Sequence, residues 1–248
     1  MMFIYNFFAN NKKRFTIIVF VIIFFFTLFK DIPTVILANA INTYSQKKLK
    51  LYDTSGTFWN GSGLLVAVDT RTNQSAPLIL LNWDIKLGIT KFIDIKFTVG
   101  NNQIADIYLN KNGLNLSKLN LSLSISQVTE LFGLIKNLGL SGNVNISTEE
   151  MLLSKKSDGI FSINLTAVSS SISPVNPLGD YTVLYNADKT SIEVTSSSSS
   201  TLLLSGNGTS SSLTLKAKVA DDKKEKMLQF ITVMGMPQPD GSYNLKIL

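Results

Sequence analysis

The residue types that carry most enzyme and metal chemistry are scarce in this chain of 248 residues. It has no histidine and no cysteine, which removes the usual zinc ligands, thiol chemistry, disulfides and the Ser-His and Cys-His nucleophile pairs. The remaining candidates for acid–base work are adjacent carboxylates, Glu149 with Glu150 and Asp221 with Asp222. Both pairs fall at turns or helix starts, where solvation or the helix dipole accounts for an acid. The sequence therefore predicts no catalytic residue, no metal site, no cofactor and no enzyme.

One N-terminal segment has a different property, because it is apolar enough to enter lipid. Residues 15–29 carry no charge and follow three cations, Lys12, Lys13 and Arg14. At 1.5 Å per residue this run covers about 22 Å, less than the roughly 30 Å hydrocarbon core. We therefore expect a transmembrane anchor over residues 15–37, although Pro33 favours a kink there. The side chains expected to anchor it in the membrane are Phe15, Ile18, Phe20, Ile23, Phe26 and Phe29.

The position of the cations predicts the orientation of the anchor. They lie on its short side, so residues 1–14 are expected to form a cytoplasmic tail and residues 38–248 an exported domain. The alternative is a cleaved signal peptide, because Ala38-Asn39-Ala40 has the form of a cleavage site. The gap of about ten residues between the apolar run and this site is longer than usual, which favours the uncleaved anchor. Both alternatives export the rest of the chain.

The net charge of +6 comes mainly from the membrane end of the chain. Residues 1–30 hold four cations and no acid, whereas the remaining residues hold 19 cations and 17 acids. Residues 31–248 are therefore nearly neutral and show no basic stripe, so a nucleic-acid partner is not expected.

The exported region alternates apolar and polar residues along most of its length, for example over 78–87, 92–99 and 213–219. Glycine- and asparagine-rich turns separate such runs. A period of two is typical of antiparallel strands with one buried or ligand-facing side and one wetted side. We therefore expect a mainly β fold, in which the transmembrane helix leads into an extended, curved antiparallel sheet.

Two short amphipathic helices interrupt this pattern. Each places apolar residues at i, i+3, i+4 and i+7, and each lies between strands. We expect residues 76–150 and 175–248 to be related repeats, although all β meanders look alike at this level. A further short helix is expected beside the membrane, over residues 32–46. The apolar positions of the two helices are Val128, Leu131, Phe132 and Ile135, and Met227, Phe230, Ile231 and Met234.

The most distinctive local motif is Gly56-Thr57-Phe58-Trp59-Asn60-Gly61. Glycines at both ends indicate a bulge or tight turn that holds Phe58 and Trp59 in defined positions. One interpretation is an aromatic contact point for a partner protein, made by Gly56, Phe58, Trp59 and Gly61. The other is a core tryptophan that fills one end of the sheet.

Three motifs in chain order resemble those of the type II secretion system protein N family. They are the Gly56–Gly61 motif, Leu178-Gly179-Asp180-Tyr181, and Met234-Gly235 followed by Asp240-Gly241-Ser242-Tyr243. The resemblance implies a single-pass protein of the inner membrane of Gram-negative bacteria, with a cytoplasmic N-terminus and a periplasmic domain. It implies no catalytic residues. It also implies that the partners are other secretion-system components in the inner membrane or periplasm, together with the lipid bilayer.

Two other functions are weighed against this one. A curved sheet with one apolar face also resembles the grooves of AsmA-like envelope proteins, which would give the chain a lipid-like ligand to carry or bridge. An exported hydrolase is the third alternative, and no constellation in the sequence favours it.

Overall fold

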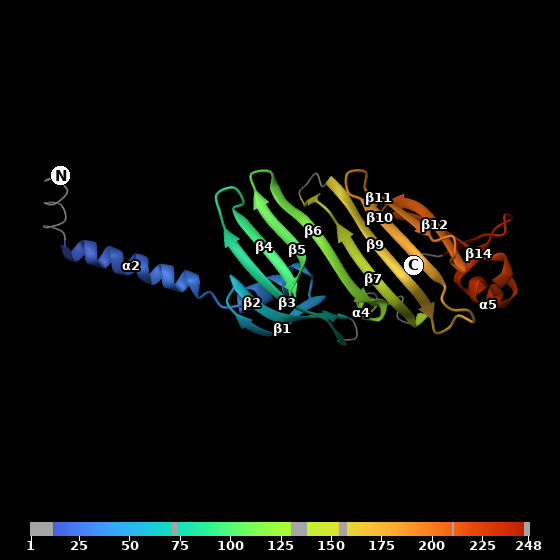
Figure 1. The fold of residues 1–248 in the computed structure, drawn as a ribbon, viewed down its shortest axis with the longest axis horizontal. Coiled ribbons are helices and arrows are strands. Elements are labelled where there is room, and N and C mark those ends of the chain that lie inside the picture. The colour runs from blue at the N-terminus through green and yellow to red at the C-terminus, as the bar shows by residue number, and fades with distance from the viewer. Residues whose placement is uncertain (1–11, 71–73, 130–137, 154–157, 210, 246–248) are drawn as a thin grey trace.

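The computed structural model describes residues 12–70, 74–129, 138–153, 158–209 and 211–245. Its main feature is a single 15-stranded antiparallel sheet, from one end of which a long helix projects (Figure 1). The helices are α2 (Lys12–Lys30), α3 (Val35–Tyr44), α4 (Ile125–Thr129) and α5 (Lys224–Met234), with a 3-10 turn η2 (Asp221–Lys223) before α5. The strands are β1 (Leu49–Gly56), β2 (Asn60–Val68), β3 (Ser75–Leu87), β4 (Ile93–Val99), β5 (Asn102–Asn110), β6 (Gly113–Ser124), β7 (Leu140–Thr148), β8 (Met151–Leu152), β9 (Asp158–Ser170), β10 (Gly179–Asn186), β11 (Ser191–Ser196), β12 (Leu202–Thr209), β13 (Ser212–Val219), β14 (Gly235–Pro237) and β15 (Tyr243–Leu245).

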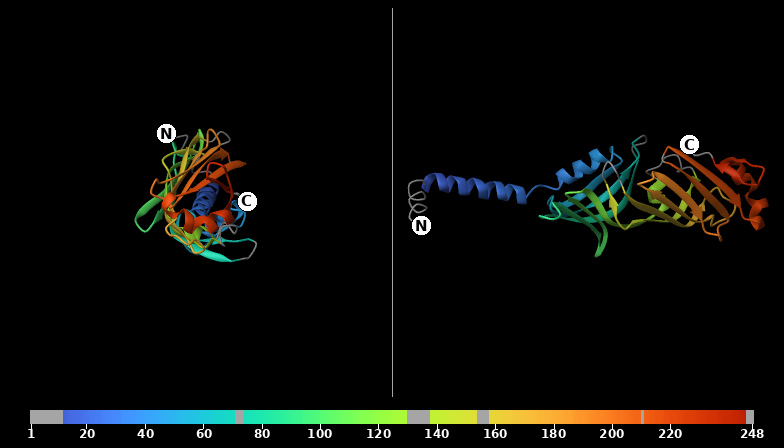
Figure 2. Two further views of the ribbon diagram at one scale, coloured as in Figure 1. Left: turned by 90° about the vertical axis from the view of Figure 1, so that its right-hand side faces the viewer. Right: turned by 90° about the horizontal axis from the view of Figure 1, so that it is seen from above.

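Neighbours in the sheet are almost always neighbours in the sequence. The order runs from β1 to β7, continues from β9 to β13, and ends with β15 and then β14. The short β8 lies beside this path and pairs with β6 and β9. Seen along its long axis, the sheet is curved rather than flat (Figure 2). Its edges, β1 and β14, lie at opposite ends of the order, so the described sheet is open.

The strand registers sort apolar and polar residues onto opposite faces, as the alternation predicts. Trp83 is paired with Phe97, and Ile95 is paired with both Ile85 and Ile107. Along β6 the apolar residues change from even-numbered to odd-numbered positions. A register shift between Asp106 and Ile107 of the neighbouring β5 keeps them on the same face of the sheet. The apolar face continues through Leu121 and Ile146, Ile163 and Val183, and Leu204 and Ala217. The opposite face carries mainly polar and charged side chains, for example Asp84 paired with Lys96 and Asn120 paired with Ser147.

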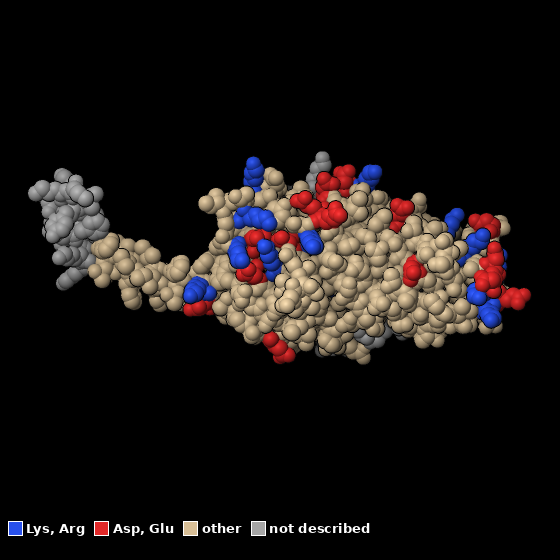
Figure 3. All heavy atoms as spheres, in the orientation of Figure 1, with Lys and Arg blue, Asp and Glu red and all other residues tan. Residues whose placement is uncertain are grey.

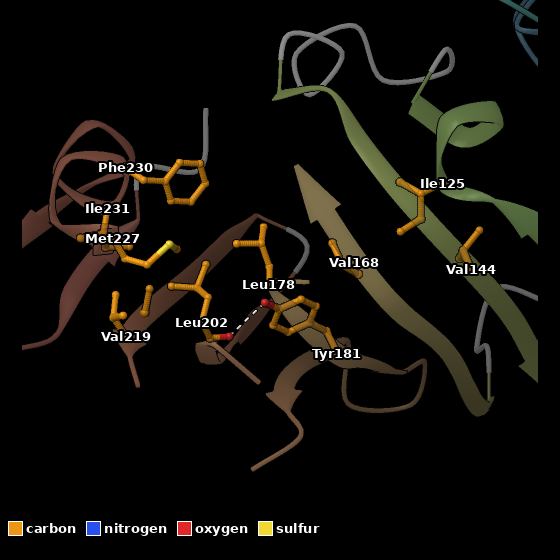
Figure 4. Packing of buried hydrophobic residues seen from close by; sticks show 11 residues of the cluster. Ile125, Val144, Val168, Leu178, Tyr181, Leu202, Val219, Met227, Phe230 and Ile231 are labelled. Carbon is orange, nitrogen blue, oxygen red and sulfur yellow. Dashed lines mark hydrogen bonds between the residues drawn. The ribbon is translucent and has the colours of Figure 1, made fainter. Parts of the chain in front are cut away.

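Helices cover parts of the apolar face and complete its core. The larger core cluster joins Met227, Phe230 and Ile231 of α5 to Leu202 and Val219 of the sheet (Figure 4). These helix positions confirm the predicted period, because all three side chains are buried. In the first predicted helix, the described α4 includes Val128, whereas Leu131, Phe132 and Ile135 lie outside the described residues.

The order strand, helix, strand occurs twice, as expected for repeats. It is formed first by β6, α4 and β7, and then by β13, α5 and β14 with β15. The pairing differs between them, because β7 pairs directly with β6, whereas β15 lies between β13 and β14. The duplication of residues 76–150 and 175–248 stays a prediction.

The N-terminal helix is shorter than the proposed continuous span. It ends at Lys30, and residues 35–44 form the separate helix α3, which confirms a short helix within residues 32–46. The reason is local, because Pro33 lacks an N–H and restricts the residue before it to extended backbone. In the described part of the chain, no helix combines the length and the apolar character required of a membrane span. The anchor over residues 15–37 stays a prediction.

A hydrogen bond made by the buried Tyr181 allows the packing beneath α5 to be tested by mutation. The Tyr181 hydroxyl donates a hydrogen bond of 3.0 Å to the Leu202 carbonyl oxygen, and both residues belong to the larger cluster (Figure 4). Tyr181→Phe should lower the free energy of unfolding by about 1–2 kcal/mol in urea denaturation, because it leaves a buried carbonyl without a donor. Tyr44→Phe, at a residue 89% exposed, should cause no change. Equal stability of wild type and Tyr181→Phe would contradict this assignment.

The pH dependence of the free energy of unfolding of the wild type and Tyr181→Phe gives a second measurement. Burial, and then the Asp180 carboxylate, raise the pKa of the Tyr181 phenol. Above about pH 10 the unfolded chain loses a proton that folded Tyr181 keeps, so the wild type loses stability as the pH rises. The stability difference between wild type and Tyr181→Phe should therefore narrow above about pH 10.

Candidate functional site: the junction between the N-terminal helix and the sheet

The Gly56–Gly61 motif forms the tight connection between β1 and β2. Gly56 has a φ of +88°, a backbone conformation that favours glycine. A Cβ atom at Gly56 would meet the Asn60 carbonyl oxygen at 2.5 Å. The turn closes through the Thr57 N–H, which donates to the same oxygen at 2.8 Å. Sequence reasoning predicted this turn, and the structure confirms it.

The second glycine of the motif faces a tryptophan in the next strand. A Cβ atom at Gly61 would lie 2.6 Å from the Trp83 ring and 2.5 Å from the Ser55 carbonyl oxygen. Trp83 is only 2% exposed, and its indole N–H lies 3.1 Å from the carbonyl oxygens of both Thr57 and Phe58. Gly61 therefore allows a buried indole to lie against the turn and donate to its backbone.

Trp59, the tryptophan of the motif itself, contacts the last turn of α2. Its indole N–H donates to the Phe29 carbonyl oxygen at 2.6 Å, and the two ring centroids are 4.5 Å apart. Phe58 packs edge-on against Trp59 with a centroid distance of 5.0 Å. Carbonyl groups in the last turn of a helix have no partner within the helix. Trp59 therefore supplies a donor to the C-terminal end of α2.

The segment between α2 and α3 is also bonded to this turn. The Phe58 N–H donates to the Ile32 carbonyl oxygen at 2.8 Å, and Pro33 forms an isolated antiparallel bridge with Thr57. The buried Thr34 donates its hydroxyl to Thr54 Oγ1 at 3.0 Å. Backbone and side-chain bonds therefore hold the chain on both sides of the helix break.

Helix α3 covers the apolar face at this end of the sheet. Leu37, Ala38 and Ile41 pack against the cluster of Leu51, Trp83 and Ile85, to which Phe58 and Trp59 also contribute. The Ile85 N–H donates to the Trp59 carbonyl oxygen at 2.6 Å, which ties β3 to the turn. The junction is therefore one packed unit that contains the end of α2, α3, the turn and three strands.

Both interpretations of the motif concerned Trp59, whereas the fully buried tryptophan at this end of the sheet is Trp83, which lies outside the motif. Trp83 fills the end of the sheet, as the core interpretation expected of Trp59. Trp59 is half-buried and contacts another part of its own chain. Sequence reasoning did not single out Trp83, although its alternation with Leu81 and Ile85 indicated an inward side chain. A contact between Gly56, Phe58, Trp59 or Gly61 and a partner protein stays a prediction.

The polar face carries a group of charges above β4 and β5, close to the junction (Figure 3). Lys91 Nζ lies 3.3 Å from Asp94 Oδ1 and 4.3 Å from the centroid of the Tyr108 ring. The Tyr108 hydroxyl donates to Glu150 at 3.0 Å, which raises the pKa of Tyr108. Burial raises the pKa of Asp106, against the opposite effect of Lys91. This group is a network of ion pairs and hydrogen bonds across neighbouring strands.

The described residues form no recognisable metal centre, and a hollow lined by apolar side chains lies along α2, where Val21, Phe25 and Phe29 contribute to it. Among the described residues, no three acids lie close enough together to hold a metal ion. A shallow hollow of about 830 Å³ lies on the polar face, where Lys118, Asn120, Glu149, Glu150 and Ser162 contribute to its lining. These polar side chains suit water, and Leu119 and Ile160 add apolar surface to the same hollow. A lipid-like ligand stays a prediction.

The two C-terminal motifs also make close internal contacts. Gly179 has a φ of +147° and approaches Ser200, and Asp180 Oδ1 accepts the Ala167 N–H at 2.7 Å. Asp240 accepts the Ser242 hydroxyl at 2.6 Å, and the Ser242 bonds hold the pKa of Asp240 below its usual value. The first of these motifs therefore ties the start of β10 to β9, and the second stabilises the turn before β15, both beside the larger core cluster.

These observations define a class of protein, in which an apolar helix is joined to a long, open antiparallel sheet that has no recognisable reaction centre in its described part. A comparison with protein families matches residues 47–246 to the description "Type II secretion system (T2SS), protein N". The chain belongs to the type II secretion system protein N family. Searches of curated proteins and of solved structures found no match.

The division of roles between the tryptophans can be tested by truncation. Trp83→Ala should lower the free energy of unfolding by about 3–5 kcal/mol, because it removes a buried aromatic side chain. Trp59→Ala should cost no more than about 1–2 kcal/mol, because that side chain is half-buried and loses one hydrogen bond. Trp59→Ala should also increase tryptic cleavage after Lys30, where α2 ends. Equal losses of stability would indicate that both side chains belong to the core.

The second glycine gives an independent test of the turn. Gly61→Ala should lower the free energy of unfolding by about 1–3 kcal/mol, because the new methyl group meets a backbone oxygen and a buried ring. Ser62→Ala, which loses an exposed hydroxyl contact with Ser55, is the matched control and should change stability by less than about 0.5 kcal/mol. Unfolding curves that coincide for the two variants would show that the approach of Trp83 to Gly61 is unimportant.

Proposed function

We propose that this chain is an inner-membrane, periplasm-facing accessory component of the type II protein secretion system that acts through protein–protein contacts. Membership of the protein N family supports a role in the type II secretion system. The observation that carries the rest of the proposal is the junction, in which Trp59 bonds an apolar helix to the end of the sheet. Such a junction would transmit the position of a membrane anchor directly to the periplasmic domain.

The side chains of α2 support a position in the bilayer. Its apolar residues are exposed around the helix, with Phe20 and Phe26 at 68% and 69% exposure. A helix in water normally has a polar stripe, whereas one that is apolar all round requires an apolar environment. Lys30 could extend to the headgroups, and Trp59 lies where interfacial tryptophans are enriched. Insertion with the N-terminal cations in the cytoplasm would place the sheet in the periplasm.

The packing of α3 favours the uncleaved form. Cleavage after Ala40 would remove Leu37 and Ala38, which pack against Trp83. It would also remove Phe29, the acceptor for Trp59, and Ile32, the acceptor for the Phe58 N–H. The mature domain would then lose much of the junction, so retention of the segment is the better explanation of these contacts.

The polar face is the surface best suited to contacts with other secretion components. Charges gather over β4 and β5, whereas the middle of this face carries few (Figure 3). In the middle, Asn145 donates to Asn120 and Ser122 at 2.9 Å, and Thr182 donates to Asn164 at 2.9 Å. This arrangement gives a broad surface of neutral donors and acceptors, which can bind a partner without the cost of desolvating charges.

The function can be tested by complementation in the bacterium that carries this chain. Deletion should reduce export of the type II substrates, and the full chain should restore it. A version in which a cleavable signal peptide replaces residues 12–30 should reach the periplasm but restore export poorly, because it lacks the anchor. Trp59→Ala should restore export less well than Tyr44→Ala at equal protein level. Undiminished export in the deletion strain would contradict the accessory role, and full export by the unanchored version would contradict the anchor.

A further inference from the structure

The connection between β3 and β4 has an exposed apolar tip. Leu87, Ile89 and Phe92 are 57%, 95% and 48% exposed. Isolated apolar residues on a surface need no explanation, but three within one turn form a local apolar patch. These residues therefore favour an environment other than water.

The apolar tip, defined as Leu87, Ile89 and Phe92, lies at the end of the sheet from which α2 projects (Figure 1, Figure 2). Two hydrogen bonds through Trp59 connect β3, which leads to the tip, with the end of α2. The Ile85 N–H bonds to the Trp59 carbonyl oxygen, and the Trp59 indole bonds to the Phe29 carbonyl oxygen. The tip is thus fixed to the same junction that holds the end of α2.

The shape of the turn keeps the tip in place. A Cβ atom at Gly88 would lie 2.9 Å from the Lys91 carbonyl oxygen, so the turn is tight. The Phe92 N–H donates to the Leu109 carbonyl oxygen at 2.8 Å, which attaches the far side of the turn to β5. The three apolar side chains are therefore presented by a bonded turn.

The nearby cations are directed to neighbours on the polar face. Lys86 Nζ lies 2.7 Å from Asp84, and this ion pair and hydrogen bond raise the pKa of Lys86. Lys91 is engaged by Asp94 and the Tyr108 ring. The three side chains of the tip are uncharged. Lys91 lies within the same turn and is paired with Asp94, so the apolar side chains can enter lipid while the Lys91 ammonium group stays among the headgroups.

We propose that the apolar tip inserts into the periplasmic interface of the same bilayer that holds α2. The proposal rests on the proposed function, because α2 must be in the membrane for the tip to reach it. Once α2 is anchored, insertion of the tip is intramolecular, so a small apolar area is enough for a persistent contact. With α2 and the tip both held, the sheet cannot rotate freely about the axis of α2, and its polar face has a fixed orientation above the membrane.

The absence of cysteine allows this contact to be measured with single spin labels on the full chain. Ile89→Cys labels the tip, Phe26→Cys labels α2, and Val233→Cys labels an 85% exposed residue of α5 at the far end of the sheet. Each variant is reconstituted in phosphatidylethanolamine and phosphatidylglycerol vesicles. Collision with oxygen, which concentrates in lipid, is compared with collision with a water-soluble nickel complex.

The oxygen-to-nickel collision ratio should be severalfold higher at positions 26 and 89 than at position 233. A ratio at 89 equal to that at 233, with a high ratio at 26, would overturn the inserted tip and leave the anchor intact. A low ratio at 26 would overturn the anchor and, with it, the inserted tip. Each labelled chain should keep the unfolding midpoint of the wild type, since Ile89 and Val233 are almost fully exposed.

Discussion

The structure depends on the indole N–H groups of two tryptophans, which make three hydrogen bonds at one turn. Trp83 donates inward to the carbonyl oxygens of Thr57 and Phe58, and Trp59 donates outward to Phe29. The backbone between them must be compact, and Gly56 and Gly61 permit this because neither carries a Cβ atom. A helix end, which normally leaves carbonyl groups without partners, is thereby joined to a sheet.

The rest of the fold follows from the difficulty of stabilising a single curved layer of strands. One face is apolar along its length, and the described helices cover it at α3, α4 and α5 rather than throughout. The edge strand β1 lies beneath α3, and the opposite edge β14 is short and ends at Pro237. Short strands and proline limit further pairing at an edge, so both ends are protected without closing the sheet.

The chain belongs to the protein N family, and the residues that carry the resemblance have structural roles in the described chain. The three motifs that carry the resemblance make internal contacts at turns and at the start of β10, and none of them assembles a reaction centre in the described structure. Gly179 allows the approach of Ser200, and Asp240 bonds Ser242 beside the final strands. In the proposed function, the polar face of the sheet would be available to partners, whereas the other face is used for packing.

The sequence alone predicted the mainly β fold, because a period of two places alternate side chains on opposite faces whatever the strand order. It also predicted α5, since Met227, Phe230 and Ile231 recur at the helical period and do become buried. It did not predict which tryptophan is the core residue, because alternation shows that Trp83 points inward but gives no distance to Gly61. Nor did it predict that the Phe29 carbonyl oxygen, next to the end of α2, accepts a hydrogen bond from Trp59, which lies 30 positions away in the sequence. Local patterns determine periodicity and turns, whereas contacts between distant segments depend on how the whole sheet brings them together.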